Sequence, residues 1–151
     1  EPKMLICDEP VSALDVSIQA QILNLLNDMK DRYGLTLIFI SHDLSVVKAI
    51  STRIMVMYLG KVCEIGTTES IYSKPAHHYT AALISSVPVP DPTHKLERTP
   101  ITGEPPSPVD PPSGCRFRTR CPAATDLCTT EEPMLRLAAD GHYVACHHPR
   151  A

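Results

Sequence analysis

The chain has 151 residues, of which 43% are hydrophobic, and a formal net charge of −3. This length provides one ordinary domain, or a small core with an appended segment, and excludes a large enzyme domain. The slightly acidic charge argues against a nucleic-acid partner, and apolar runs such as residues 35–40 are far shorter than the roughly 20 residues that cross a bilayer.

Composition divides the sequence into three segments. Residues 1–86 show apolar periodicity, residues 87–113 form a connector with nine of the fifteen prolines, and residues 114–151 form a tail with four of the six cysteines. Proline lacks a backbone N–H, so the connector is expected to be extended or irregular. We predict a mixed α/β domain over 1–86, a linker over 87–113 and a small irregular cysteine-rich extension over 114–151.

The first expected elements are a strand, a helix and a second strand. Residues 4–7 form a continuous apolar run of the kind found in fully buried parallel strands. Apolar residues then recur at helical spacing up to Tyr33, with Asp15 as the expected N-cap and Gly34 as the expected left-handed C-cap. Residues 35–40 are expected to form a second buried strand. This order predicts two parallel strands joined by a crossover helix.

Shorter elements are expected in the rest of the first segment. They are a helix over 43–50, a hairpin of strands 53–58 and 61–65 that turns at Leu59-Gly60, and two helices over 68–73 and 77–86 separated by Pro75. Cys7 and Cys63 fall within predicted strands and are expected to be small core residues rather than ligands.

Two acidic residues, Asp8 and Glu9, follow the first strand directly. In open α/β sheets, ligands bind at the carboxyl ends of the strands. Adjacent residues of an extended chain point to opposite sides, so we expect Asp8 to face a phosphate-bound magnesium ion and Glu9 to face the attacking water. An ordinary loop start is the alternative for this pair.

A histidine, His42, follows the second strand at the same expected sheet edge. It could donate a hydrogen bond to the terminal phosphate of a nucleotide. The alternative is a surface histidine that caps a helix together with Asp43. The presence of Asp8 and Glu9 at the neighbouring strand end favours the phosphate contact.

These residues resemble three motifs of ABC ATPases, in the same order and spacing. Residues 4–10 resemble the Walker B motif, Ser12-Ala13-Leu14-Asp15 resembles the D-loop, and Ser41-His42-Asp43 resembles the histidine switch. The resemblance implies part of a P-loop NTPase fold with a parallel sheet flanked by helices.

The resemblance also implies residue roles. Asp8 would hold Mg²⁺ through water, Glu9 would polarise the attacking water, and His42 would be catalytic and contact the terminal phosphate of ATP. Asp15 would belong to a loop that crosses to a second nucleotide-binding domain. The Gly-rich phosphate loop, the glutamine loop and the Ser-Gly-Gly signature are missing, and no glycine precedes Asp8. The chain is therefore interpreted as the carboxy-terminal fragment of a longer ATPase, inactive by itself.

Four thiols of the tail could converge on one metal centre: Cys115, Cys121, Cys128 and Cys146. Four thiolates suit zinc or an iron-sulfur cluster, although the lack of a Cys-x-x-Cys pair makes zinc less favoured. Three histidines remain possible substitute ligands: His142, His147 and His148. Three arginines could stabilise an anionic cluster or form a solvated basic edge: Arg116, Arg118 and Arg120.

The tail is similar to the carboxy-terminal extension of dipeptide and oligopeptide importer ATPases. The similarity lies in residues 114–122, Cys128, Glu132-Pro133 and Cys146-His147, together with the proline-rich connector. Some members of that group carry a four-iron, four-sulfur cluster on these cysteines. The resemblance thus implies ATP and Mg²⁺ as cofactors, with a 4Fe-4S cluster, or Zn²⁺ in its place, in the tail.

The resulting hypothesis is an ATP-hydrolysing subunit that energises uptake of dipeptides or oligopeptides. The resemblance implies a second ABC ATPase domain, identical or different, and transmembrane permease subunits as partners. An extracytoplasmic peptide-binding protein would be an indirect partner, and the subunit would lie at the cytoplasmic face of the plasma membrane. The alternatives are the ATPase of a related nickel importer, a metal-binding or iron-sulfur module without catalysis, and an ABC ATPase of repair or translation.

Overall fold

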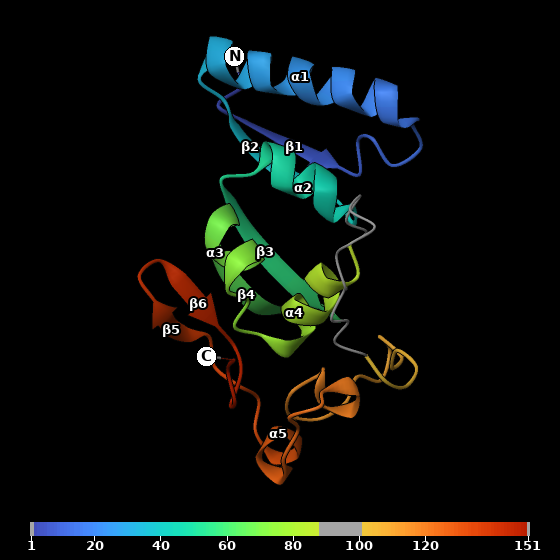
Figure 1. The fold of residues 1–151 in the computed structure, drawn as a ribbon, viewed down its shortest axis with the longest axis vertical. Helices are drawn as coiled ribbons and strands as arrows, with labels where there is room; N and C mark the ends of the chain where they lie inside the picture. The colour runs from blue at the N-terminus through green and yellow to red at the C-terminus, as the bar shows by residue number, and fades with distance from the viewer. Residues whose placement is uncertain (1, 88–100, 151) are drawn as a thin grey trace, which may run out of the picture. The chain divides into compact units, whose positions relative to one another are not determined.

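The computed structural model describes residues 2–87 and 101–150, so residues 88–100 of the predicted linker lie outside the described residues. The chain divides into two compact units, residues 1–51 and residues 52–151. Their elements are labelled in Figure 1. Among the residues described in these two ranges, no helix is long and apolar enough to cross a membrane.

The first unit consists of two strands and two helices in the order β1 (Met4–Asp8), α1 (Val16–Tyr33), β2 (Thr36–Ile40) and α2 (Leu44–Ile50). The two strands are parallel, with Met4 opposite Thr36 and Asp8 opposite Ile40. This arrangement confirms the predicted strand, helix, strand order and the short helix that follows it.

The ends of α1 are set by the two residues that the sequence predicts. The Asp15 carboxylate accepts hydrogen bonds from the backbone N–H groups of Ser17 and Ile18, which otherwise lack partners in a first helical turn. Gly34 adopts a left-handed conformation with φ of 61°, and its N–H donates to the carbonyl of Lys30. Both capping predictions are confirmed.

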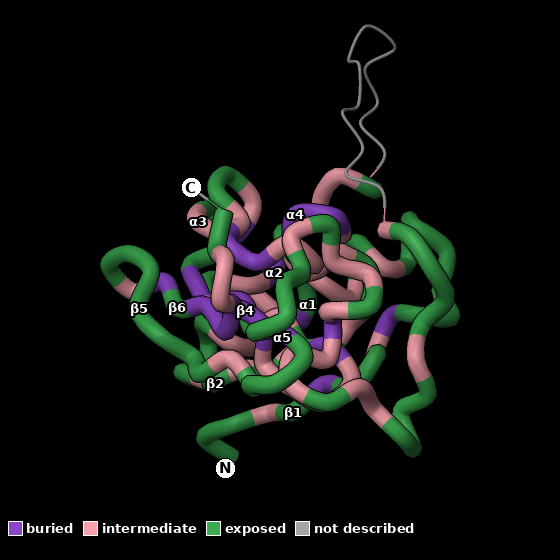
Figure 2. Tube along the Cα trace, turned by 90° about the horizontal axis from the view of Figure 1, so that it is seen from below, coloured by how far each residue is buried: buried purple, intermediate pink, exposed green. Residues whose placement is uncertain are grey.

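The sheet of the first unit is covered on one face only. Cys7, Leu26 and Ile50 form a buried core there, which brings α1 and α2 onto the same face. Four apolar residues of the other face are exposed: Met4, Ile6, Ile38 and Ile40. The prediction of fully buried strands is therefore wrong for this structure, because the pleat sends alternate residues to a face that no helix of the unit covers. In Figure 2 most of β1 has the colours of exposed and partly buried residues.

The second unit is built on an antiparallel sheet with the strand order β3-β4-β6-β5. Its elements are β3 (Arg53–Tyr58), β4 (Lys61–Thr67), α3 (Thr68–Ser73), α4 (His78–Ser85), the 3₁₀-helix η1 (Arg118–Arg120), α5 (Asp126–Thr130), β5 (Arg136–Ala139) and β6 (His142–Val144). The predicted hairpin is confirmed. Leu59 and Gly60 both have positive φ, 46° and 76°, as a two-residue turn between right-twisted strands requires.

The tail is more regular than the sequence predicts. Its residues 136–144 form a hairpin around Gly141, and β6 pairs with β4 through Glu64–Val144 and Ile65–Tyr143. The expectation of an irregular extension is wrong for this part. Strands of three and four residues are too short to show a clear alternation in sequence, and they form because β4 offers an edge with free hydrogen-bonding groups.

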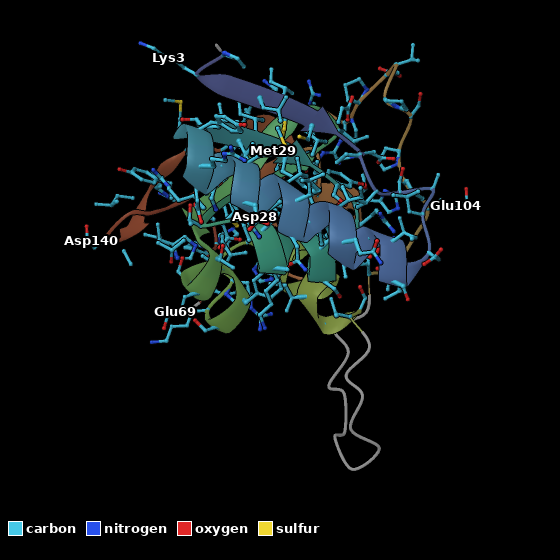
Figure 3. All side chains as sticks on the ribbon, turned by 90° about the horizontal axis from the view of Figure 1, so that it is seen from above. Lys3, Asp28, Met29, Glu69, Glu104 and Asp140 are labelled. Carbon is cyan, nitrogen blue, oxygen red and sulfur yellow. The ribbon has the colours of Figure 1, made fainter. Side chains whose placement is uncertain are left out.

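Aromatic residues form the core of the second unit. Phe117 is 1% exposed, and its ring lies 5.4 Å from that of Tyr58 and 5.3 Å from that of Tyr79. Tyr58 and Phe117 form one buried cluster with Cys63. In contrast, charged side chains such as Lys3, Asp28 and Glu69 lie on the surfaces of their units (Figure 3).

A buried carboxylate joins three parts of the second unit. Glu64, in β4, is 0% exposed and accepts hydrogen bonds from the backbone N–H groups of Ala76 at 2.6 Å and His77 at 3.0 Å. It also contacts Nε2 of His142, in β6, at 2.6 Å. A buried polar group needs such partners, so Glu64 connects β4 both to the start of α4 and to the tail.

We expect His77 to make the stability of the second unit pH-dependent. Burial lowers the pKa of His77 from 6.5 to about 4, against the opposing effect of Glu64. Unfolded His77 therefore binds a proton that the folded form does not bind, and stability should fall by roughly 3 kcal/mol as the pH drops from above 6.5 to about 4.

Denaturant unfolding at a series of pH values would measure this dependence. His77→Asn is the matched variant, because its side chain can still cap α4 as Nδ1 of His77 does for the N–H of Tyr79, but it cannot titrate. The slope of stability against pH should become smaller in this variant. An unchanged slope would assign the dependence to another group.

Candidate functional site

The carboxyl ends of β1 and β2 bring the predicted nucleotide-site residues to one sheet edge. Asp8 is the last residue of β1 and lies opposite Ile40, the last residue of β2. The N–H of Glu9 donates to the carbonyl of Ile40 at 2.9 Å, which extends the parallel pairing one residue beyond β1. Residues 8 and 9 therefore lie beside the chain that leads into His42.

Glu9 and His42 are in direct contact although 33 positions separate them. His42 Nδ1 lies 2.9 Å from Glu9 Oε1, and the two side chains are 74% and 47% exposed. The hydrogen bond to Glu9, followed by the negative charge of Glu9, raises the pKa of His42 above 6.5. The pair is thus an open, solvent-accessible acid and imidazole at the edge of a parallel sheet.

The backbone at Glu9 differs from the expected extended chain. Glu9 has φ of 46°, in the left-handed region that residues other than glycine seldom adopt. The separate directions of Asp8 and Glu9 therefore do not follow from strand alternation alone. They depend on a chain reversal at Glu9, which the Ser12 N–H and hydroxyl support by donating to the Glu9 carbonyl.

We expect Glu9→Gln to lower the pKa of His42 towards its ordinary value. The raised pKa means that the contact stabilises the folded chain fully below the pKa of an unfolded histidine and is lost as the pH rises through the raised value. NMR titration of the His42 ring would measure this shift. His77 of the second unit serves as the internal control, and its lowered pKa should be the same in both proteins.

The segment predicted as the D-loop is a surface turn held by its own helix. Ser12, Ala13, Leu14 and Asp15 are exposed, and the Asp15 carboxylate is occupied in capping α1. The amide of Gln19 donates to the carbonyls of Val11 and Leu14 at 3.2 and 3.0 Å. Sequence reasoning missed Gln19, since only the folded turn places its side chain beside this segment.

The alternative role of His42 as a helix cap does not hold. The carboxylate of Asp43 caps α2 by accepting from the N–H groups of Ser45 and Val46 at 2.8 and 3.3 Å. His42 is left to contact Glu9. The two neighbouring residues thus have different roles: Asp43 caps α2, and His42 contacts Glu9.

All four tail thiols are free and lie in the second unit. Cys128 and Cys146 are buried, whereas Cys115 and Cys121 are partly buried. The N–H of Cys115 donates to the carbonyl of Cys128 at 2.8 Å. This approach requires Gly114, whose φ is 62° and where an added Cβ would lie 2.4 Å from the same carbonyl.

The thiols are close enough to influence one another electrostatically. Burial is the main cause that raises the pKa of Cys115, of Cys121 and, to about 11, of Cys146. The charges of the other tail thiols act in the same direction. Without a positive ion nearby, these groups are therefore protonated thiols at neutral pH, and a metal would have to displace their protons.

A single-metal site does not form in the described part of the chain. Nowhere in residues 2–87 and 101–150 do three His, Cys, Asp or Glu side chains come together to hold one ion. The candidate substitute ligands have other partners: His142 contacts Glu64, His147 the carbonyl of Glu131, and His148 the hydroxyl of Thr125. The zinc alternative is therefore not supported by this arrangement.

The three tail arginines bind backbone carbonyl groups. Arg116 donates to the carbonyl of Leu59, Arg118 to that of Ser113 at 2.9 Å, and Arg120 to that of Gly103 at 3.2 Å. They connect the tail to the β3–β4 turn and to the connector. The three arginines are therefore not a free basic edge, since each of them makes a hydrogen bond within the second unit.

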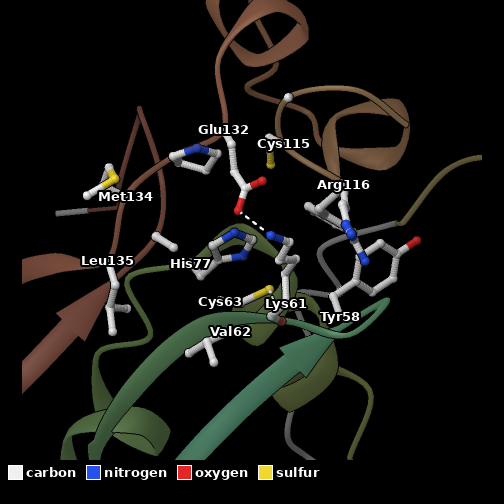
Figure 4. Close-up of a pocket in the computed structure, with 14 residues that line it drawn as sticks. Tyr58, Lys61, Val62, Cys63, His77, Cys115, Arg116, Glu132, Met134 and Leu135 are labelled. Atoms are coloured by element: carbon white, nitrogen blue, oxygen red, sulfur yellow. Dashed lines mark hydrogen bonds and ion pairs between the residues drawn. The ribbon is translucent and has the colours of Figure 1, made fainter. Parts of the chain in front are cut away.

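A cavity of about 390 Å³ lies beside the tail in the second unit. Its walls include Cys63 and Cys115, with apolar contributions from Phe117 and Leu135. Lys61 and Glu132 form an ion pair of 2.7 Å at this cavity (Figure 4), and the hydrogen bond from Lys61 is the main cause that lowers the pKa of Glu132. The sequence does not predict this cavity, because its walls come from β3, β4, the start of α4 and the tail.

Comparison with known proteins shows that the chain is similar to ATP-binding proteins of peptide transporters. Residues 63–128 match the family described as "Oligopeptide/dipeptide transporter, C-terminal region". The chain is 56% identical over 146 residues to a putative peptide import ATP-binding protein of Brucella ovis, covering 97% of this chain and 46% of the relative.

Two oligopeptide transport ATP-binding proteins named OppF are similarly close. The protein of Haemophilus influenzae is 55% identical, with 97% of this chain and 45% of the relative covered, and that of Escherichia coli is 55% identical, with 97% and 44% covered. The chain is thus related over nearly all its length to peptide-import ATP-binding proteins, which confirms the family resemblance. It spans about half the length of the curated relatives it matches.

Proposed function

We propose that the chain is part of the ATP-hydrolysing subunit of an ABC importer for dipeptides or oligopeptides. The observation that carries this proposal is the contact between Glu9 and His42 beside Asp8, at the carboxyl ends of β1 and β2. The names of the relatives support a peptide as the transported substrate and favour it over nickel.

The residues at this edge would divide the chemistry of ATP hydrolysis. Asp8 would hold Mg²⁺ through water, and the bound ion would neutralise charge on the phosphates. Glu9 would orient and polarise the attacking water. His42 Nδ1 faces a carboxylate, so it carries a proton, and the raised pKa favours a second proton on Nε2 that could be donated to the terminal phosphate.

The remaining phosphate contacts would come from outside this chain. A Gly-rich loop at a helix N-terminus provides most phosphate contacts in such sites, and no such loop occurs in the sequence. We expect the chain by itself to bind ATP weakly and not to hydrolyse it. The exposed turn over residues 12–15 would face a second nucleotide-binding domain.

The proposed partners follow from this role. They are a second ABC ATPase domain, transmembrane permease subunits and, indirectly, an extracytoplasmic peptide-binding protein, with the subunit at the cytoplasmic face of the membrane. The test compares this chain with the full-length gene product that contains it, in permease-containing proteoliposomes. Only the latter should release phosphate from Mg-ATP and drive peptide uptake. Hydrolysis without any peptide dependence would contradict the importer assignment.

We also propose a thiolate-bound iron-sulfur centre in the second unit. Four free thiols lie there, close enough for their charges to raise the pKa of Cys115, Cys121 and Cys146, and no three of them come together as the ligands of one ion. In a four-iron, four-sulfur cluster each thiolate binds a different iron atom, so its ligands stand further apart than the ligands of one ion. Anaerobic purification followed by iron, sulfide and zinc determination tests this: iron with sulfide supports the centre, and zinc alone or no metal contradicts it.

A further inference from the structure

The cavity beside the tail has the size and lining of a small-molecule site that the proposed ATP site does not use. Its volume of about 390 Å³ lies within the roughly 300–1,000 Å³ that is usual for ligand pockets. All of its lining residues belong to the second unit. Six apolar side chains contribute to its walls: Val62, Phe117, Pro133, Met134, Leu135 and Ala145.

The buried residues of this lining are neutral. Phe117 and His77 are both buried, and their rings lie 5.8 Å apart. Burial lowers the pKa of His77 to about 4 and raises the pKa of Cys63 to about 12, so neither side chain is charged at neutral pH. A neutral thiol behaves as a small apolar group. An occupant that contacts these residues is therefore apolar over that part of its surface.

The charged residues of the lining leave one net positive charge, because Lys61 and Arg116 are cationic and Glu132 is anionic. Glu132 pairs with Lys61 at 2.7 Å, and their side chains are 58% and 44% exposed, so a ligand can reach this pair (Figure 4). The charge of Arg116 also helps to lower the pKa of Glu132. Both cations thus lie within electrostatic reach of one carboxylate, and a second carboxylate would neutralise the cavity.

The side-chain nitrogen atoms at the cavity offer hydrogen-bond donors. The ammonium group of Lys61 has three N–H bonds, and the guanidinium of Arg116 has five, one of which donates to the carbonyl of Leu59. Nδ1 of His77 accepts from the N–H of Tyr79, so the proton of the neutral ring lies on Nε2. A carboxylate only accepts hydrogen bonds, which makes it a suitable partner for such donors.

We propose that this cavity binds a small apolar monocarboxylate, with its carboxylate at Lys61 and Arg116 and its apolar body against Phe117. The binding is non-covalent. Because β4, the start of α4 and the tail all contribute lining residues, a bound ligand would connect these three parts of the second unit. The inference rests neither on ATP hydrolysis nor on the proposed iron-sulfur centre.

The test measures binding to the full-length protein that contains this chain. Isothermal titration calorimetry compares octanoate with octanamide and octylammonium, which have the same chain length but are neutral or cationic. N-acetyl-leucine is a second carboxylate, because the ligand could be a fatty acid or the end of a peptide, and the tighter of the two carboxylates identifies the source. NMR of the methionine methyl groups locates the site, with Met134 in the lining and Met29 of α1 as the control.

We expect octanamide to bind more weakly than octanoate by roughly tenfold or more, because it loses hydrogen bonds that involve a charged group. Octylammonium should not bind measurably. The carboxylates should shift the methyl signal of Met134 and leave that of Met29 unchanged. Equal binding of octanoate and octanamide, no binding of either carboxylate, or binding without a shift at Met134 would each overturn the proposal.

Two substitutions break the same ion pair and should change carboxylate binding in opposite directions. Lys61→Gln removes a cation and should weaken binding by roughly two- to fivefold, the range of an exposed ion pair. Glu132→Gln removes the competing carboxylate and should strengthen binding by a similar factor. Thermal unfolding checks that both variants fold. A change in the same direction in both variants would show that the pair acts only through the structure, and it would overturn the proposal.

Discussion

Glu9→Gln in the full-length protein is expected to lower ATP turnover by roughly 10²–10⁴-fold, the usual contribution of a positioned general base. The amide retains the shape of the carboxylate but cannot accept a proton or polarise water to the same degree. Nucleotide binding should be nearly unchanged, because Glu9 is not expected to contact the phosphates directly. Steady-state phosphate release and equilibrium ATP binding would measure the two effects separately.

Glu104→Gln provides a matched control for this substitution. Glu104 is an exposed acid of the connector and should leave turnover unaffected. Normal turnover in Glu9→Gln would remove the role assigned to Glu9, whereas loss of binding as well as turnover would indicate that Glu9 holds the nucleotide or the backbone at its left-handed position.

Glu64→Ala is expected to destabilise the second unit by about 3–5 kcal/mol, because each buried hydrogen-bonding group left without its partner costs about 1–3 kcal/mol. The substitution leaves the N–H groups of Ala76 and His77 without acceptors, and it leaves His142 without its carboxylate partner. Because β4 pairs with β6 at Glu64, the tail should loosen together with the start of α4.

Urea unfolding monitored by circular dichroism would measure this loss, and Glu104→Ala should change stability by less than about 0.5 kcal/mol, as exposed positions usually do. The loss of stability in Glu64→Gln should lie between those of Glu64→Ala and Glu104→Ala. The amide oxygen can still accept one hydrogen bond, but the amide NH₂ group would face a backbone N–H, and two donors cannot bond to each other. A Glu64→Ala loss as small as that of Glu104→Ala would show that the buried network contributes little.

Local sequence patterns were sufficient to predict most elements of the first unit. Asp15 and Gly34 satisfy the backbone groups at the two ends of α1, and these caps depend on neighbouring residues only. The Leu59-Gly60 turn is equally local. The burial of β1 could not be predicted in this way, because an apolar run shows that a strand can be buried and not which faces are covered.

The candidate nucleotide site was also predicted in part. The positions of Asp8, Glu9 and His42 at one sheet edge follow from strand order, which the sequence shows. The left-handed backbone at Glu9 and the support from Gln19 do not, because both depend on how the chain reverses after β1.

The sequence by itself determined the strand, helix, strand order, the caps, the hairpin and the acid and histidine residues that follow two strands. These features depend on local propensity and on spacing along the chain. Only the tertiary structure decided that Glu9 contacts His42, that the tail completes the sheet beside β4, and that Cys63 lies beside Cys115 at one cavity. Such contacts join residues 33 or more positions apart, and pairing between distant strands creates them.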